Sequence, residues 1–315
     1  MMYPCVKHRI VALALCIAAS LAVVGCPQSA PTIEEFSYGG LVRKYKVHVS
    51  ALYDKDTPAP LLVVLHGMGQ KGDDVEGLTG LNNLADEHGF LAVYPDAYQG
   101  NWNDARAVPD IPAYDLDVDD VGFILAVIDR VAANYNVDAA RVYAAGMSNG
   151  AMMAYRLACE APGVFAAAAA VAGAMPENLA AACAPSIPIP MVMINGTADP
   201  VVPWDGGPIM LDGEELGVVL SVLDSVALWV TKNGAAQTPE VTLLPDAAPE
   251  DGVRVYKEEH AGFGAGAEVV LYRIEGGGHT WPGGAVLFQL FLGPICQDIN
   301  ASSIIWEFCS PYARP

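Results

Sequence analysis

The chain has 315 residues, of which 53% are hydrophobic and 17% charged, enough for one large domain with a substantial core. It carries 36 Asp and Glu against 16 Lys and Arg, which gives a formal net charge of −20. A chain this acidic repels the phosphates of nucleic acids, so the composition argues against a nucleic-acid partner. It also argues against simple electrostatic attachment to anionic lipid heads.

The N-terminus has the pattern of an export signal. A positive group at 7–9 precedes an apolar stretch at 10–25, which is short for a membrane span and typical of a signal peptide. The stretch ends directly before Cys26, and small residues before a cysteine at this place resemble a bacterial lipobox. We therefore expect cleavage before Cys26 and lipidation of its thiol.

This pattern predicts an exported protein that is anchored to a membrane of the cell envelope. Ordinary cleavage near Gly25 or Ala30, without a lipid, would instead give a secreted protein. The expected organisation is a lipoprotein signal peptide at 1–25, a tether at 26–36 and a single domain at 37–315.

Short apolar runs alternate with helix-like segments through the rest of the chain. This alternation predicts an α/β fold with a mostly parallel central sheet and helices on both faces. An alanine run at 166–170 suits a tightly packed strand, although its composition also suits a helix. Polar segments at 205–216 and 245–267 offer a small cap. The expected strands are 43–50 (an antiparallel edge), 61–65, 90–94, 141–146, 165–172, 190–195 and 268–274, and the expected helices are 74–88, 120–134, 149–160, 217–232 and 298–309.

One pentapeptide carries the clearest chemical signal. Gly146-Met147-Ser148-Asn149-Gly150 is a G-x-S-x-G motif between an expected strand and an expected helix. Strand, tight turn and helix are the context of a nucleophile elbow, in which the serine hydroxyl is exposed at the end of the sheet of an α/β hydrolase. Ser148 is therefore the candidate nucleophile.

A serine nucleophile needs a histidine base and an acid that orients it, and on this scaffold they follow the serine in the order acid, then histidine. His279 lies just after an expected strand, whereas His260 lies in a polar segment typical of a surface loop. Asp199 follows the strand at 190–195, and its alternative role is that of a turn residue before proline. Asp205 lies further from that strand, and Asp96 precedes the serine. We expect His279 and Asp199 in the triad.

The oxyanion of the reaction needs preorganised N–H donors. One is the backbone N–H of Asn149, the residue after the nucleophile. The second is expected from the loop after the strand at 61–65, with Met68 preferred and Gly67 next. His66 precedes the serine and is expected to brace this loop by hydrogen bonds.

The acidic run at 115–120 has two interpretations. Several carboxylates together suit a calcium ion. They also suit the N-terminus of the helix expected at 120, where acidic side chains cap the backbone and interact with the helix dipole. We favour the N-cap.

Taken together, the motifs resemble the esterase family that includes polyhydroxybutyrate depolymerase-like, feruloyl and acetylxylan esterases. The resemblance implies an α/β-hydrolase fold and the triad Ser148, Asp199 and His279. The motifs that carry it are Leu-His-Gly-Met-Gly-Gln (65–70), Tyr-Pro-Asp (94–96), Trp-Asn (102–103), Asp-Val-Gly-Phe-Ile (120–124), Gly-Met-Ser-Asn-Gly-Ala-Met (146–152), Asn-Gly-Thr-Ala-Asp-Pro-Val-Val-Pro-Trp (195–204) and Gly-Gly-Gly-His-Thr-Trp-Pro-Gly-Gly (276–284).

The resemblance also suggests that Trp102 and Trp281 lie near the substrate. With Trp204 they are expected on loops beside the site, where aromatic platforms suit sugar or phenolic groups. Simple packing is the equal alternative for loop tryptophans.

Of the seven cysteines, three lie at Cys26 or before it. The remaining four suggest two disulfides in an oxidising compartment, although four cysteines allow three pairings. Closeness in sequence favours Cys159–Cys183 and Cys296–Cys309, and the resemblance supports the first. Buried free thiols are the alternative. No Cys/His spacing suggests zinc, and no metal or cofactor is expected.

We expect an exported serine esterase that cleaves carboxylic esters through an acyl-enzyme on Ser148. Polyhydroxyalkanoate-like oligomers, feruloyl or acetyl esters and short-chain esters are the expected substrates. A serine peptidase shares this chemistry. A lipid-anchored binding protein on the same scaffold, without turnover, is the alternative from another class.

Overall fold

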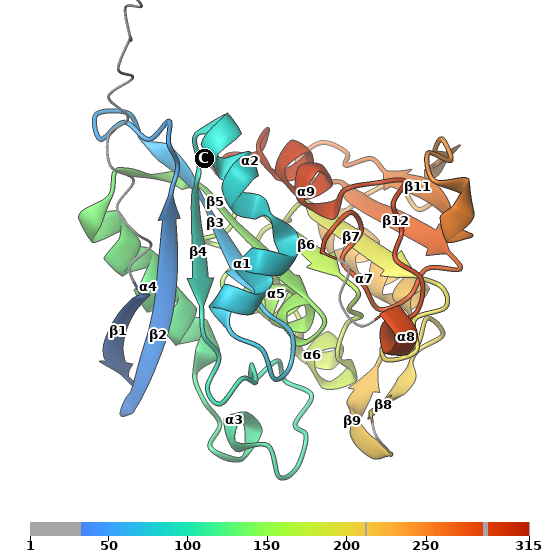
Figure 1. Cartoon of the computed structure of the whole chain (residues 1–315), viewed down its shortest axis with the longest axis horizontal. Helices are drawn as coiled ribbons and strands as arrows, with labels where there is room; N and C mark the ends of the chain where they lie inside the picture. Colours follow the sequence, from blue (N-terminus) through green and yellow to red (C-terminus); the bar gives the residue numbers. More distant parts are fainter. Residues whose placement is uncertain (1–32, 212, 286–288, 315) are drawn as a thin grey trace, which may run out of the picture. The chain divides into compact units, whose positions relative to one another are not determined.

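A computed structural model describes residues 33–211, 213–285 and 289–314, and the predicted signal peptide and Cys26 lie outside them. The described residues form a ten-stranded sheet in the order β1-β2-β4-β3-β5-β6-β7-β12-β11-β10 (Figure 1). Its strands are β1 (Ile33–Tyr38), β2 (Leu41–Val49), β3 (Ala59–Leu65), β4 (Leu91–Pro95), β5 (Val137–Met147), β6 (Ala167–Val171), β7 (Met191–Gly196), β10 (Glu240–Leu243), β11 (Arg254–His260) and β12 (Val269–Glu275).

The centre of this sheet is parallel and both of its edges are antiparallel. Neighbouring strands from β4 to β12 run parallel, whereas β1 and β2 on one side and β11 and β10 on the other are antiparallel. A separate hairpin is made by β8 (Gly207–Leu211) and β9 (Glu214–Val219). The helices are α1 (Gly72–Thr79), α2 (Leu81–His88), α3 (Pro112–Asp115), α4 (Asp120–Asn134), α5 (Asn149–Glu160), α6 (Glu177–Ala182), α7 (Val222–Asn233), α8 (Gln289–Leu292) and α9 (Ala301–Cys309).

Helices cover both faces of the parallel strands, and β3 at the centre is apolar and buried along its whole length. In β3, Leu62 and Val64 pack in one cluster with residues of α1, α2 and α9. Leu61 and Val63 point to the opposite face and pack with α4 and α5. Alternate side chains of a strand point to opposite faces, so this continuous apolar run fills two cores. The predicted α/β-hydrolase architecture is confirmed (Figure 1).

The alanine run is a strand, as predicted. All residues of β6 (Ala167–Val171) are buried between β5 and β7. Short side chains let α5 approach one face of β6 and α9 the other. The neighbours of β6 therefore decide its conformation against its helical propensity.

Two of the predicted helices have different bounds in the structure. The helix expected at 74–88 is two helices, because Gly80 adopts a left-handed conformation with φ 64°. The helix expected at 217–232 begins only at Val222, and Ser221 caps it by accepting the N–H of Asp224. Residues 217–219 of the expected helix belong to β9.

Part of the predicted cap at 245–267 belongs to the sheet. β11 pairs with β12 over its whole length, and the expectation of a surface loop around His260 is wrong. His260 ends β11 and is buried, with its Nδ1 2.7 Å from the Ala236 carbonyl oxygen. At the other edge β1 begins at Ile33, inside the predicted tether, so the sheet starts before the predicted boundary at residue 37.

The acidic run starts a helix, as favoured. Asp119 is the N-cap of α4 and accepts the backbone N–H of Gly122 at 2.8 Å. Asp120 is fully buried and forms an ion pair with Arg43 at 2.6 Å. Asp117 accepts a hydrogen bond from the Asn103 amide. These carboxylates therefore have protein partners. Across the described residues no helix has the length and apolar character needed to cross a membrane.

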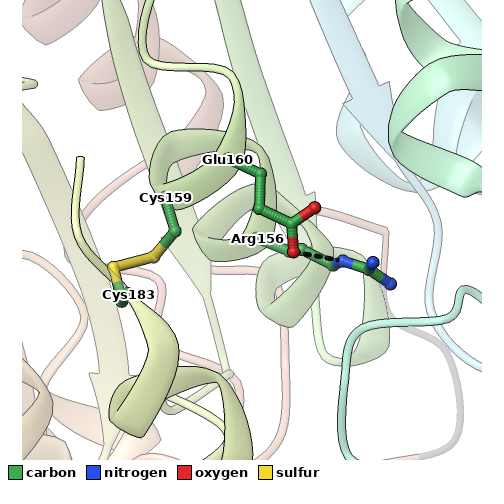
Figure 2. The surroundings of a disulfide bond; sticks show 4 residues. All are labelled: Arg156, Cys159, Glu160 and Cys183. Atoms are coloured by element: carbon green, nitrogen blue, oxygen red, sulfur yellow. Dashed lines mark hydrogen bonds and ion pairs between the residues drawn. A yellow bond between two sulfur atoms is a disulfide. The ribbon is translucent and has the colours of Figure 1, made fainter. Parts of the chain in front are cut away.

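The predicted disulfide Cys159–Cys183 is present (Figure 2). It joins the last turn of α5 to the residue that follows α6, and the Cα atoms are 5.1 Å apart. On the same end of α5, Arg156 pairs with Glu160 one turn along the helix at 2.8 Å (Figure 2). The end of α5 away from Ser148 is thus covalently fixed.

The second predicted disulfide is wrong. Cys296 and Cys309 are both buried free thiols. Cys296 lies before α9, whereas Cys309 is its last residue. A nine-residue helix carries its last Cα about 12 Å along its axis, and bridged cysteines need Cα atoms within about 7 Å. Closeness in sequence is therefore not enough to predict a disulfide.

Candidate active site

Ser148 lies in the sharp turn between β5 and α5. Its backbone has φ 56° and ψ −120°, a conformation that non-glycine residues rarely adopt. The flanking glycines make the turn possible. A Cβ on Gly146 would lie 2.3 Å from the Gly150 carbonyl oxygen, and one on Gly150 would lie 2.2 Å from the Leu65 carbonyl oxygen. The turn thus has the geometry of a nucleophile elbow packed against the end of β3.

The structure brings His279 and Asp199 together from loops that follow β12 and β7. Nδ1 of His279 is 2.8 Å from Oδ2 of Asp199, and both side chains are buried. The other carboxylate oxygen of Asp199 accepts the backbone N–H groups of Val201 and Val202 at 2.7 and 2.9 Å. Asp199 is therefore held by its own turn and presents one oxygen to the imidazole.

The two loops meet backbone against backbone. A Cβ on Gly196 would lie 2.2 Å from the Gly277 carbonyl oxygen, and one on Gly278 would lie 2.1 Å from the Leu292 carbonyl oxygen. The backbone N–H of His279 donates to that same Leu292 oxygen. The glycines before His279 thus allow the approach that fixes the position of its ring.

The candidate oxyanion donors lie beside Ser148. Met68, Gly67 and Asn149 all line one cavity with it. The Gly67 N–H donates to the Gln70 side chain at 2.9 Å, which favours Met68 as the donor from this loop. Asn149 is the first residue of α5, and the first N–H groups of a helix have no partner within it.

His66 braces the oxyanion loop, as predicted. Its Nε2 accepts the N–H of Ala97 at 3.0 Å, so its Nδ1 carries the proton and donates to the Gly67 carbonyl at 2.7 Å. Burial lowers the pKa of His66, which favours this neutral form. Trp102 packs on the ring and donates from its indole to the His66 carbonyl.

A buried polar network that we did not predict holds the Asn149 side chain. The Asn149 amide donates to the Trp102 carbonyl and, at 2.6 Å, to Asp104, while its oxygen accepts the Trp102 N–H. Asp104 pairs with Arg106 at 2.9 Å, and Tyr114 donates to Asp104. The sequence gives little sign of this network. Asp104 and Arg106 follow the Trp-Asn motif, but the bond from Asn149 to Asp104 spans 45 positions.

The guanidinium of Arg106 stays charged in this network. Burial alone lowers its pKa, but the carboxylate of Asp104 and the hydroxyl of Tyr114 outweigh burial and raise the pKa above its usual value. Arg106 also donates from Nη1 to the Leu216 carbonyl of β9 at 2.9 Å. The network therefore connects the first residue of α5 with the hairpin β8–β9.

Ser148 and His279 line a cavity of about 250 Å³ whose walls are mostly apolar. Trp281 is one of its lining residues. Trp102 is fully buried below the oxyanion loop, and Trp204 packs on a core cluster. The full burial of Trp102 contradicts the prediction that it lies beside the substrate, whereas for Trp204 and Trp281 that contact stays a prediction.

The competing candidates lie elsewhere. Asp96 accepts the N–H of Gly72 at the start of α1, and Asp205 is exposed. One group with metal-ligand chemistry, Asp251, Cys296 and Asp298, occurs in the described chain. Burial raises the pKa of Cys296 to about 11, so without a metal this thiol is protonated at neutral pH.

Fold and site together define an α/β hydrolase. The family model described as "Esterase PHB depolymerase" matches residues 50–227, and the chain belongs to this family. It is therefore a carboxylic ester hydrolase.

Comparison with individual proteins agrees with this assignment. NocK of Nocardia uniformis subsp. tsuyamanensis, named as an esterase, is 36% identical over 270 residues, which are 82% of this chain and 76% of NocK. Feruloyl esterase B of Piromyces equi is 27% identical over 240 residues, 76% of this chain but only 42% of that protein. The structure of acetyl xylan esterase from Aspergillus awamori, 15% identical, matches with a TM-score of 0.52 over 79% of this chain and 94% of that one, a likeness of fold.

Proposed function

We propose that this chain is a serine esterase with the catalytic triad Ser148, His279 and Asp199. Ser148 Oγ attacks the ester carbonyl carbon while His279 Nε2 takes its proton, and Asp199 stabilises the imidazolium. The N–H groups of Asn149 and Met68 bind the oxyanion. His279 then protonates the leaving alcohol, and water activated by the same ring releases the acid.

One observation carries this proposal: the strained turn at Ser148 borders the same cavity as His279, whose ring is hydrogen-bonded to Asp199. Strain of this kind persists where the surrounding structure fixes it, and it is concentrated at active sites. A buried carboxylate that orients a histidine beside a partly buried serine is the arrangement that activates a hydroxyl at neutral pH.

The substrates we propose are esters of small or medium acyl groups without charge. The cavity is mostly apolar and, at about 250 Å³, just below the range of pockets for drug-sized ligands. Short-chain aliphatic esters, hydroxyalkanoate oligomers and feruloyl or acetyl esters all satisfy these limits, and the names of the relatives include feruloyl esterases and an acetylxylan esterase.

The nucleophile is tested with the purified full-length chain, p-nitrophenyl butyrate and methyl ferulate. We expect Ser148→Ala to lower kcat about 10⁶-fold, and a fluorophosphonate to label Ser148 in the wild type. Ser303→Ala, on α9, is the matched control and should retain activity. A wild type that cleaves neither ester and takes no label would contradict the proposal. Cleavage of peptides in place of esters would indicate a peptidase.

We also propose that the chain is exported and lipidated on Cys26. The positive and apolar segments before this residue support export, and so does the Cys159–Cys183 disulfide, since disulfides persist in oxidising compartments. In a bacterial host fed labelled palmitate, the wild type should carry label in the membrane fraction and Cys26→Ser should not. Equal labelling of the two proteins, or none, would overturn the lipid anchor.

A further inference from the structure

Two groups of residues, from distant parts of the chain, line the active-site cavity. One, the histidine wall, comes from the C-terminal part of the chain and contains Trp281 and Ile295. The other, the hairpin wall, contains Ile209 and Leu211 of β8 and Leu216 of β9. The hairpin forms a separate two-stranded sheet beside the ten-stranded one.

The hairpin wall is joined to α5 through the core. Ile209 and Val219 pack in one hydrophobic cluster with Met152, which lies one turn after Ser148 on α5. The side of the hairpin toward the core is therefore fixed, while Leu211 is 42% exposed at the cavity.

Arg106 fixes the other side of the hairpin. Its Nη1 donates to the Leu216 carbonyl, and its charge is held by Asp104, which also accepts from the Asn149 side chain. A Cβ on Gly217, which has φ +84°, would lie 3.0 Å from the Arg106 Cβ, so backbone and side chain are in close contact.

The segment that carries Arg106 is itself under constraint. Ala105 and Ala107 both have positive φ, at 74° and 58°. Alanine rarely adopts this conformation, and such strain persists where neighbours over-determine it. Hairpin, strained segment and oxyanion donor thus form one preorganised unit around the cavity.

Reaction geometry decides which part of the ester meets this unit. The leaving oxygen must face His279, because the imidazolium gives it the proton. The acyl chain, on the other bond of the carbonyl carbon, points away from that ring.

We propose that the hairpin wall selects the acyl group of the ester, with Ile209 limiting its length, and that the histidine wall accommodates the alcohol. This inference rests on the proposed serine esterase function. Because the hairpin wall is aliphatic, it favours uncharged hydrocarbon acyl groups, and because Ile209 is fully packed, it limits how far they extend.

The test compares two isoleucines that are equally buried on the two walls, Ile209 and Ile295. For each alanine variant of the full chain, kcat/KM is measured on p-nitrophenyl esters from acetyl to octanoyl, and on butyrate esters from methyl to hexyl alcohols. We expect Ile209→Ala to raise the octanoyl-to-butyryl ratio about tenfold and to leave the order of alcohols unchanged. Ile295→Ala should change the order of alcohols and keep the acyl ratio.

Leu211→Ala is the second variant, because a half-exposed side chain can be shortened without risk to folding. It should shift the acyl ratio about threefold in the same direction. An acyl ratio at the wild-type value in both hairpin variants would overturn the inference, and so would an equal shift in Ile295→Ala. Wild-type protein that turns over no ester would overturn the serine esterase function itself, and the inference with it.

Discussion

Asp199 divides its two carboxylate oxygens between structure and chemistry. One accepts two backbone N–H groups of its own turn, and the other faces Nδ1 of His279. Asparagine keeps an oxygen for the turn, but its amide would donate to the imidazole. The ring would then hold the wrong tautomer, with its proton on the nitrogen that should accept from Ser148.

We therefore expect Asp199→Asn to fold like the wild type and to lose about 10⁴-fold in kcat. The measurement is kcat on p-nitrophenyl butyrate, with thermal unfolding as the check on folding. Asp205→Asn is the control, since this carboxylate is exposed, and its kcat should equal that of the wild type. The reverse result, with activity lost in Asp205→Asn alone, would exchange their roles.

At the level of residues, sequence could predict which candidate side chains lie at strand ends. Ser148, Asp199 and His279 each follow a strand in the parallel part of the sheet. The carboxyl ends of parallel strands lie at the same edge of the sheet, so the sequence already places the three residues at that edge. The prediction for Trp102 was wrong because an indole packs on a nearby core as readily as beside a substrate. Asp104 was missed because its hydrogen bond to Asn149 spans 45 positions, which no local pattern reveals.

At the level of elements, the approach of α5 to β3 sets the position of Ser148. This approach depends on Gly150, whose added Cβ would lie 2.2 Å from the Leu65 carbonyl. The Leu65 carbonyl is part of the backbone and cannot move aside as the end of a side chain can. A Cβ at Gly150 would therefore displace α5.

We expect Gly150→Ala to cost about 1–3 kcal/mol of unfolding free energy and about 10²-fold in kcat, since a displacement near 1 Å has that effect on a reacting group. The control is Gly77→Ala within α1, where nothing lies within 4 Å of the added Cβ. It should be stabilised by about 0.5–1 kcal/mol with unchanged kcat. Urea unfolding and steady-state kinetics check both variants. Full activity in Gly150→Ala would show that the contact does not position the nucleophile.

Predictability also differs between elements. The central strands were predicted because burial on both faces makes them continuously apolar. β11 was missed because an antiparallel strand near the edge of the sheet can alternate charged and apolar side chains: Arg254 and Lys257 are on it, yet Val255 is buried. β8 and β9 were missed because most of their side chains are exposed or half-buried, and only a few contact the cavity.

At the level of the whole molecule, the Cys159–Cys183 disulfide stabilises the fold at a distance from the chemistry. It lies at the end of α5 opposite to Ser148, and a twelve-residue helix separates its ends by about 16 Å. The bond closes a loop with a sequence separation of 24. A loop of this length removes conformational entropy from the unfolded chain equivalent to about 3 kcal/mol.

We therefore expect the double variant Cys159→Ser, Cys183→Ser to lose about 3 kcal/mol of unfolding free energy while kcat on p-nitrophenyl butyrate stays within about twofold, because the strained turn at Ser148 is held by β3 and β5. Guanidinium unfolding with and without dithiothreitol separates the bond from the substitution. Reductant should lower the stability of the wild type to that of the variant and leave the variant unchanged. Loss of activity at retained stability would instead place the disulfide in the support of the active site.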